Sequence, residues 1–162
     1  MRYRRKIIFL FIAAGLLGAF GKPIRACDRP ELSKGQIVYV PAYSHIYSAS
    51  NEMTILLAVT LSIRNTDINN PLKLNRVDYY GTKGNLLKEY LDSTIVLGPL
   101  ESLKFVIPEK DESGGSGANF IIEWSSDKCT NQPIVETIMI GTVMQQGISF
   151  TSRGQVIVDS EH

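Results

Sequence analysis

Hydrophobic and polar residues alternate along much of this chain, in short runs separated by turn residues. The clearest run covers residues 54–65, where Leu57, Val59, Leu61 and Ile63 share one face and smaller or polar residues share the other. A period of two residues places successive side chains on opposite faces of a β-strand. This run therefore predicts a strand with one face in a hydrophobic core and one face in water.

A second run begins directly after a glycine-rich stretch, Gly114–Gly117. In the residues that follow, Phe120, Ile122 and Trp124 alternate with more polar neighbours, and Trp124 is the only tryptophan of the chain. Glycine accepts the positive φ angles of tight turns and lets other backbone come close. We therefore expect the central strand of the fold here, entered through a glycine turn.

The remaining runs complete an all-β pattern without a convincing helix outside the amino-terminal segment. Residues 125–133 are polar and are expected to form a loop. The spacing of the runs predicts an antiparallel, immunoglobulin-like β-sandwich of seven to eight strands. Besides the two runs above, its strands are expected at residues 36–40 as an edge strand ended by Pro41, at 74–80 and 86–91 as a hairpin, and at 102–107, 134–141 and 148–158.

The amino terminus has the pattern of a secretory signal peptide. Basic residues at positions 2–6 precede an uncharged apolar run at 7–20, and small or helix-breaking residues follow. Cleavage is expected after Gly21, with a second site after Ala26. The expected organisation is a signal peptide at residues 1–21, a linker at 22–35, the β-domain at 36–158 and a tail at 159–162.

The two cysteines, Cys27 and Cys129, leave three alternatives open. Cys27 follows Ile24 and Ala26 in a partial match to a bacterial lipoprotein box, which would make it an acylation site and a lipid anchor, although Arg25 departs from that pattern. An exported chain could instead form a Cys27–Cys129 disulfide, or keep two free thiols. Two isolated cysteines lack the ligand spacing of a metal site.

The charge of the exported part argues against nucleic acid as a partner. The chain has 17 basic and 16 acidic residues, and four of the basic ones lie in residues 1–21, which contain no acid. The remainder therefore has 13 basic against 16 acidic residues, a net charge of −3. Nucleic-acid-binding domains carry a basic patch or stripe, and none is evident here.

Catalytic and cofactor motifs are not evident in the sequence. The glycine-rich stretch is followed by a strand, whereas a phosphate-binding loop leads into a helix. His45 is the only histidine of the β-domain, which is too few for a copper site and leaves one candidate base for a nucleophile. We therefore expect no enzyme activity, no cofactor and no metal.

Three polar segments are candidates for a binding surface. An arginine among hydroxyl groups can bind a carboxylate or a sugar, and sandwich loops gather at the two ends of the fold. If the segments converge, they form one contact surface. Its candidate residues are Tyr43, His45 and Tyr47 in the first segment, Ser116 and Asn119 in the second, and Ser149, Thr151 and Arg153 in the third.

Five segments of the chain resemble a bacterial family catalogued as domain of unknown function 3124, and together they span roughly residues 32–157. The resemblance implies an envelope protein that is often made as a lipoprotein, located in the periplasm or anchored in the envelope. It implies no activity, cofactor or catalytic residue. The segments are Leu32–Pro41, Tyr43–Tyr47, Leu61–Asp67, Gly114–Phe120 and Gly147–Gly154.

These observations favour a non-catalytic β-sandwich, exported to the envelope, that binds a protein partner or a small surface ligand. Two alternatives remain. The first is a hydrolase-like enzyme in which His45 acts beside a hydroxyl or carboxylate. The second is a structural spacer domain on a lipid anchor at Cys27, which would be its one link to the membrane.

Overall fold

The structure, a computed structural model, describes residues 27, 29, 31–47, 53–143 and 146–160. The expected signal peptide and its cleavage sites lie outside these residues. The described part contains no helix, and thus none that is long and apolar enough to cross a membrane. The all-β class is confirmed.

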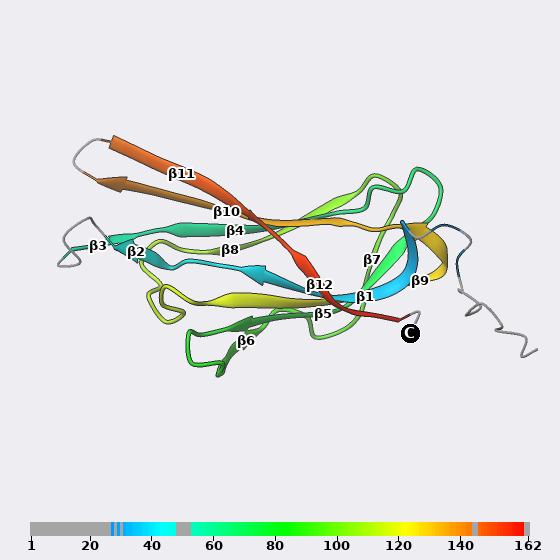
Figure 1. The fold of residues 1–162 in the computed structure, drawn as a ribbon, viewed down its shortest axis with the longest axis horizontal. Coiled ribbons are helices and arrows are strands. Elements are labelled where there is room, and N and C mark those ends of the chain that lie inside the picture. Colours follow the sequence, from blue (N-terminus) through cyan, green and yellow to red (C-terminus); the bar gives the residue numbers. More distant parts are fainter. Residues whose placement is uncertain (1–26, 28, 30, 48–52, 144–145, 161–162) are drawn as a thin grey trace, which may run out of the picture.

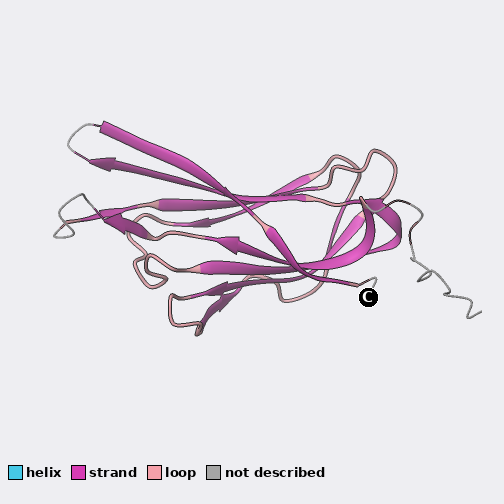
Figure 2. Cartoon of the chain, in the orientation of Figure 1, coloured by secondary structure: helices cyan, strands magenta, loops and turns pink. Residues whose placement is uncertain are grey.

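The described residues form twelve strands, and every strand pair is antiparallel (Figure 2). In chain order they are β1 (Leu32–Pro41), β2 (His45–Tyr47), β3 (Thr54–Leu56), β4 (Ala58–Arg64), β5 (Leu72–Tyr80), β6 (Leu86–Glu89), β7 (Ile95–Leu97), β8 (Ser102–Ile107), β9 (Asn119–Asn131), β10 (Ile134–Val143), β11 (Gln146–Arg153) and β12 (Gln155–Asp159).

The strands form two larger sheets and one small one (Figure 1). The six-stranded sheet has the order β12-β1-β9-β5-β6, with β7 beside β5. The four-stranded sheet has the order β11-β10-β4-β8. Strands β2 and β3 form a separate two-stranded sheet.

One hydrophobic core lies between the two larger sheets. The expected inward residues of β9, Phe120, Ile122 and Trp124, are almost completely buried, and so are Leu61 and Ile63 of β4. Each large apolar side chain that leaves water contributes about 1.5–3 kcal/mol. The alternation in the sequence thus identified the buried faces of both central strands.

The number of strands exceeds the expected seven to eight because two predicted runs divide and two further short strands, β2 and β7, are present. Residues 54–65 separate at Leu57 into β3 and β4, and the run at 148–158 separates at Gly154 into β11 and β12. Residues 95–97 add β7, which pairs with β5. The hairpin of β5 and β6 forms as predicted.

Two further expectations were wrong. Strand β1 is not an edge strand, because it pairs with β12 on one side and β9 on the other, and it begins at Leu32 within the expected linker. Residues 125–131 are not a loop but continue β9. The polar composition of these residues gave no sign of a strand. In the structure they pair with the start of β1, and a register shift between Ser33 and Gly35 accommodates the extra β9 residues.

Gly154 lies where the chain passes from the four-stranded sheet to the six-stranded sheet. A Cβ atom there would lie 2.6 Å from Cγ1 of Val38 and 3.1 Å from the carbonyl oxygen of Val135. Its backbone N–H donates to that same carbonyl at 2.8 Å. A side chain at position 154 would therefore push the two sheets apart where the connection from β11 to β12 joins them.

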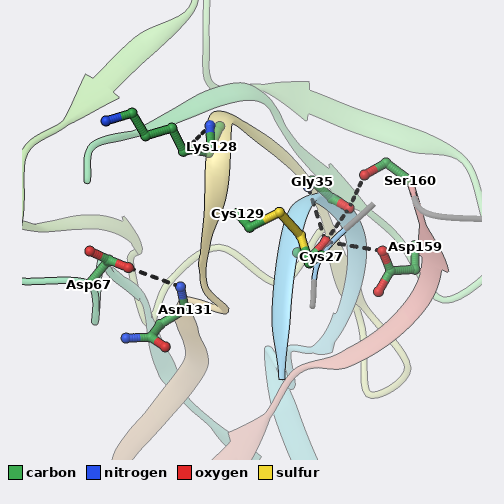
Figure 3. Close-up of a disulfide and its surroundings, with 10 residues drawn as sticks. Cys27, Gly35, Asp67, Lys128, Cys129, Asn131, Asp159 and Ser160 are labelled. Atoms are coloured by element: carbon green, nitrogen blue, oxygen red, sulfur yellow. Dashed lines mark hydrogen bonds between the residues drawn. A yellow bond between two sulfur atoms is a disulfide. The ribbon is translucent and has the colours of Figure 1, made fainter. Parts of the chain in front are cut away.

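Cys27 and Cys129 form a disulfide, which ties the start of the described chain to the carboxyl end of β9 (Figure 3). The two residues are 102 positions apart, and Cys27 is buried. A loop of this length corresponds to about 4–5 kcal/mol of stabilisation in the chain-entropy description. Neither sulfur is a free thiol.

Asp67 organises the turn between β4 and β5. Its Oδ1 accepts hydrogen bonds from the backbone N–H groups of Asn69 and Asn70, both at 2.8 Å, and its Oδ2 accepts one from Asn131 of β9 at 3.1 Å. Burial raises the pKa of this carboxyl, but these backbone donors outweigh burial and hold the pKa of Asp67 well below its ordinary value. The ionised carboxylate therefore stabilises the fold.

We predict that Asp67→Asn lowers the free energy of unfolding at pH 7 by about 2 kcal/mol, because an amide cannot accept all of these donors. The depressed pKa stabilises the native state above the ordinary carboxyl value of 3.8. In the wild type this stabilisation is lost as the pH falls below that value, and the variant lacks this part of the pH dependence.

Urea unfolding at several pH values measures both effects. Asp127→Asn is the matched control, because its carboxylate is 81% exposed and pairs with Lys73 on the surface. We expect the control to change the free energy of unfolding by less than about 1 kcal/mol. Equal effects of the two substitutions would contradict the role assigned to Asp67.

Candidate functional site

The candidate binding residues divide between two places in the fold. The Tyr43–Tyr47 segment and the Gly114–Gly117 bend meet at one end of the molecule. Backbone N–H groups of Ala42 and Ser44 donate to the carbonyls of Ala118 and Gly115, at 2.8 and 3.1 Å. The hydroxyls of Tyr47 and Ser116 lie 3.2 Å apart within hydrogen-bonding distance.

The glycine bend is also held from the turn between β5 and β6. Thr82 donates from its backbone N–H and from its hydroxyl to the carbonyl of Gly114, at 2.8 and 2.9 Å. The same hydroxyl accepts the N–H of Gly117 at 2.9 Å. Gly115 has φ of 78°, the positive angle that the sequence predicted for this stretch.

A buried tyrosine lies directly against the bend. The hydroxyls of Tyr79 and Ser44 are 2.9 Å apart, and burial raises the pKa of Tyr79. A Cβ atom on Gly114 would overlap the Tyr79 hydroxyl. The backbone groups of the bend are thus engaged by neighbouring segments, and the bend serves as a junction of three segments.

His45 lies in β2, opposite Leu56 of β3. Its ring is 5.4 Å from that of Tyr47, in an edge-to-face arrangement. Its Nδ1 atom is buried and has no hydrogen-bond partner among the described residues. Among the described residues, Nδ1 of His45 thus receives no hydrogen bond from a hydroxyl and makes none to a carboxylate.

The third candidate segment points elsewhere. Ser149, Thr151 and Arg153 are exposed on one face of β11, as their alternation predicted. Phe150, on the opposite face of that strand, packs against Tyr43 with ring centroids 5.8 Å apart. The hydroxyls and the arginine thus face away from the Tyr43–Tyr47 segment, and the three segments do not form one common site.

Asn119 follows closely after the bend and begins β9. It is half-buried at the start of β9, where it pairs with Pro41 of β1 and Tyr80 of β5. Its position is therefore within the six-stranded sheet rather than beside the β11 residues.

Instead, the β11 residues belong to a continuous surface, the face of the four-stranded sheet that points away from the core. We call this surface the outer face. Strand register places its side chains in cross-strand rows, which are Arg153–Glu136–Ser62–Lys104, Thr151–Ile138–Thr60–Val106 and Ser149–Ile140–Ala58.

The outer face combines exposed aliphatic side chains with basic side chains that form few ion pairs. Ile140 is 52% and Val106 is 49% exposed. Arg64 pairs with Glu136 at 3.5 Å and donates from Nε to the hydroxyl of Ser62 at 3.1 Å. No ion pair of Lys104 or Arg153 occurs among residues 31–47, 53–143 and 146–160.

Sequence reasoning missed Ile140, Val106 and Lys104 as members of this surface. Their strands were predicted, but β10 carries aliphatic residues on both faces, with Val135 and Met139 buried and Ile140 exposed. Alternation alone does not say which face is inward. Only the pairing of β10 with β4 and β11 decides it.

Within the described residues, no group of three or more His, Cys, Asp or Glu side chains is arranged to hold a metal ion. The outer face is an exposed sheet surface on which another molecule can pack.

Comparison with known proteins gives a family but no activity. A family model described as "Protein of unknown function (DUF3124)" matches residues 35–157. No curated protein matches the chain. A solved structure described as the crystal structure of Thermotoga maritima 1070 is 12% identical, with a TM-score of 0.46 over 79% of this chain and 97% of that one.

We predict that Gly114→Ala destabilises the protein by about 3 kcal/mol or more, because the new methyl group would overlap the buried Tyr79 hydroxyl and strain the junction. Gly147→Ala is the matched control, since a Cβ atom there meets no atom within 4 Å. Thermal unfolding of both variants measures the difference. A Gly114 variant as stable as the control would show that the junction tolerates the overlap.

Proposed function

The chain belongs to the DUF3124 family of proteins of unknown function, and from this premise we propose that it is an exported, non-catalytic envelope protein that binds a protein partner. The contact is made through the outer face of the four-stranded sheet. The fold that presents this face is an immunoglobulin-like β-sandwich. Two larger antiparallel sheets with one core between them support that architecture.

Export is supported by two independent features of the chain. The first is the basic, apolar and small-residue pattern of residues 1–21. The second is the Cys27–Cys129 disulfide, because such bonds form and persist in oxidising compartments such as the bacterial periplasm. The two features point to the same location.

The disulfide also bears on how the protein is held in the envelope. A cysteine acylated as a lipoprotein carries the lipid on the same sulfur that a disulfide uses. With Cys27 bonded to Cys129, this sulfur has no bond left for an acyl anchor. We therefore propose a periplasmic protein without a lipid at Cys27, and the alternative of a spacer on a lipid anchor loses its attachment point.

The observation that carries the binding proposal is the exposure of Ile140 and Val106 on the outer face, which also presents the charged side chains of Lys104 and Arg153. Exposed aliphatic side chains rimmed by polar ones mark protein contact sites. The hollow on this face, lined by Lys104 among others, is open rather than enclosed, so a protein surface fits it better than a small molecule does. The hydrolase alternative gains no support from His45, whose Nδ1 has no hydrogen-bond partner among the described residues.

We expect the mass of the mature protein, purified from its native envelope without reduction, to correspond to a chain that keeps Cys27 and carries no acyl group. Reduction should raise that mass by two hydrogens, because it opens one disulfide. Intact-mass spectrometry before and after reduction measures both. A mass increased by fatty acyl chains would contradict the proposed form and restore the lipid-anchor alternative.

We predict that Ile140→Lys disrupts the native assembly of this protein, because a lysine at a buried contact must give up its water. The measurement is the native mass of the protein in a mild envelope extract. The matched control is Val96→Lys on β7 of the other sheet, where the replaced side chain is 56% exposed. Loss of the larger species for Ile140→Lys alone is expected, and equal behaviour of the two variants would contradict the assigned face.

A further inference from the structure

The outer face ends at an open sheet edge. Strand β8 lies at the end of the four-stranded sheet and pairs with β4 alone among the described strands. An edge strand of this kind presents backbone N–H and C=O groups along one side that a further strand can pair with. Strand β8 is therefore a candidate for pairing with a strand from another molecule.

The core beneath this edge is incompletely covered. Leu103 and Phe105 of β8 point inward but are only half-buried, whereas their cross-strand partners Ile63 and Leu61 of β4 have no exposed surface. Tyr90 covers part of Phe105, with ring centroids 5.0 Å apart in an edge-to-face arrangement. A strand added beside β8 would bury the remaining aliphatic and aromatic surface with its own inward side chains.

The outward side chains of β8 line a shallow hollow on the outer face. Lys104 and Ser102 line it together with Arg64 of β4 and Ile138 of β10. Lys104 is exposed and has no ion pair among the described residues. The hollow thus offers an unneutralised ammonium group next to aliphatic surface.

The positive charge of the outer face favours an acidic partner segment at the β8 edge. The outer face carries Arg64, Lys104 and Arg153 against Glu136, a local charge of +2 on a domain whose net charge is −3. Two copies of the chain that paired through the centre of β8 would bring their Lys104 ammonium groups together, and like charges directly opposite each other are destabilising. An acidic partner segment is favoured by the same charge.

We propose that β8 binds an extended, acidic segment of the envelope partner, which adds to the four-stranded sheet as an antiparallel strand. This inference rests on the proposed function and specifies how the outer face is used. Cross-strand pairing places an acidic residue opposite Lys104 and an aliphatic residue opposite Val106. In the antiparallel direction, the partner segment reads aliphatic, then a β-branched residue whose methyl group packs on Phe105, then acidic.

Two synthetic peptides test this pattern with the mature, isotope-labelled protein. Both are threonine-rich and nine residues long, and one contains valine–threonine–glutamate where the other contains valine–threonine–lysine. We expect the glutamate peptide to shift the backbone amide resonances of β8 and to bind about three- to tenfold more tightly than the lysine peptide. The preference should shrink at high salt.

Charge reversal provides the decisive control. Lys104→Glu should invert the preference between the two peptides, whereas Lys83→Glu, at an exposed position in the turn between β5 and β6 of the other sheet, should leave it unchanged. Absence of binding at about 1 mM glutamate peptide, or resonance shifts away from β8, would overturn strand addition. If Ile140→Lys still disrupts the native assembly in that case, the proposed face stands and only the mode of contact is wrong.

Discussion

The structure depends on the burial of one face of β9 in the middle of the six-stranded sheet. Phe120, Ile122 and Trp124 meet the inward residues of the opposite sheet, and β1 and β5 take their register from either side of this strand. The glycine bend fixes the beginning of β9, and the disulfide together with the Asp67 turn fixes its end. Both sheets are placed by contacts to this strand.

Much of the fold could be predicted from alternation alone, because a strand with one buried face has apolar residues at every second position. This held for β4, for the first half of β9 and for the β5–β6 hairpin. It failed for β1, whose Pro41 suggested an edge, and for residues 125–131, whose polar side chains hid a strand. Pairing between distant strands decides these cases, and local patterns carry no information about it.

The site was only partly predictable for the same reason. The exposed face of β11 followed from its own alternation, but its neighbours Glu136 and Ile140 became part of one surface only through strand register. The Tyr43–Tyr47 segment and the glycine bend looked equally suited to binding, yet their polar groups largely hold the fold together. Polar residues in loops can either bind another molecule or stabilise the fold, and their hydrogen-bond partners in the structure distinguish these two roles.

The most direct test of the account is photocrosslinking in cells from single positions on the two opposite sheets. A photoreactive residue at Thr151, on the outer face, is compared with one at Asn75, which is exposed on β5 of the six-stranded sheet. The account predicts one partner protein captured from Thr151, lost when Ile140→Lys is added, and absent from Asn75. Capture of the same proteins from both positions, or capture that persists with Ile140→Lys, would contradict the assignment of the working face.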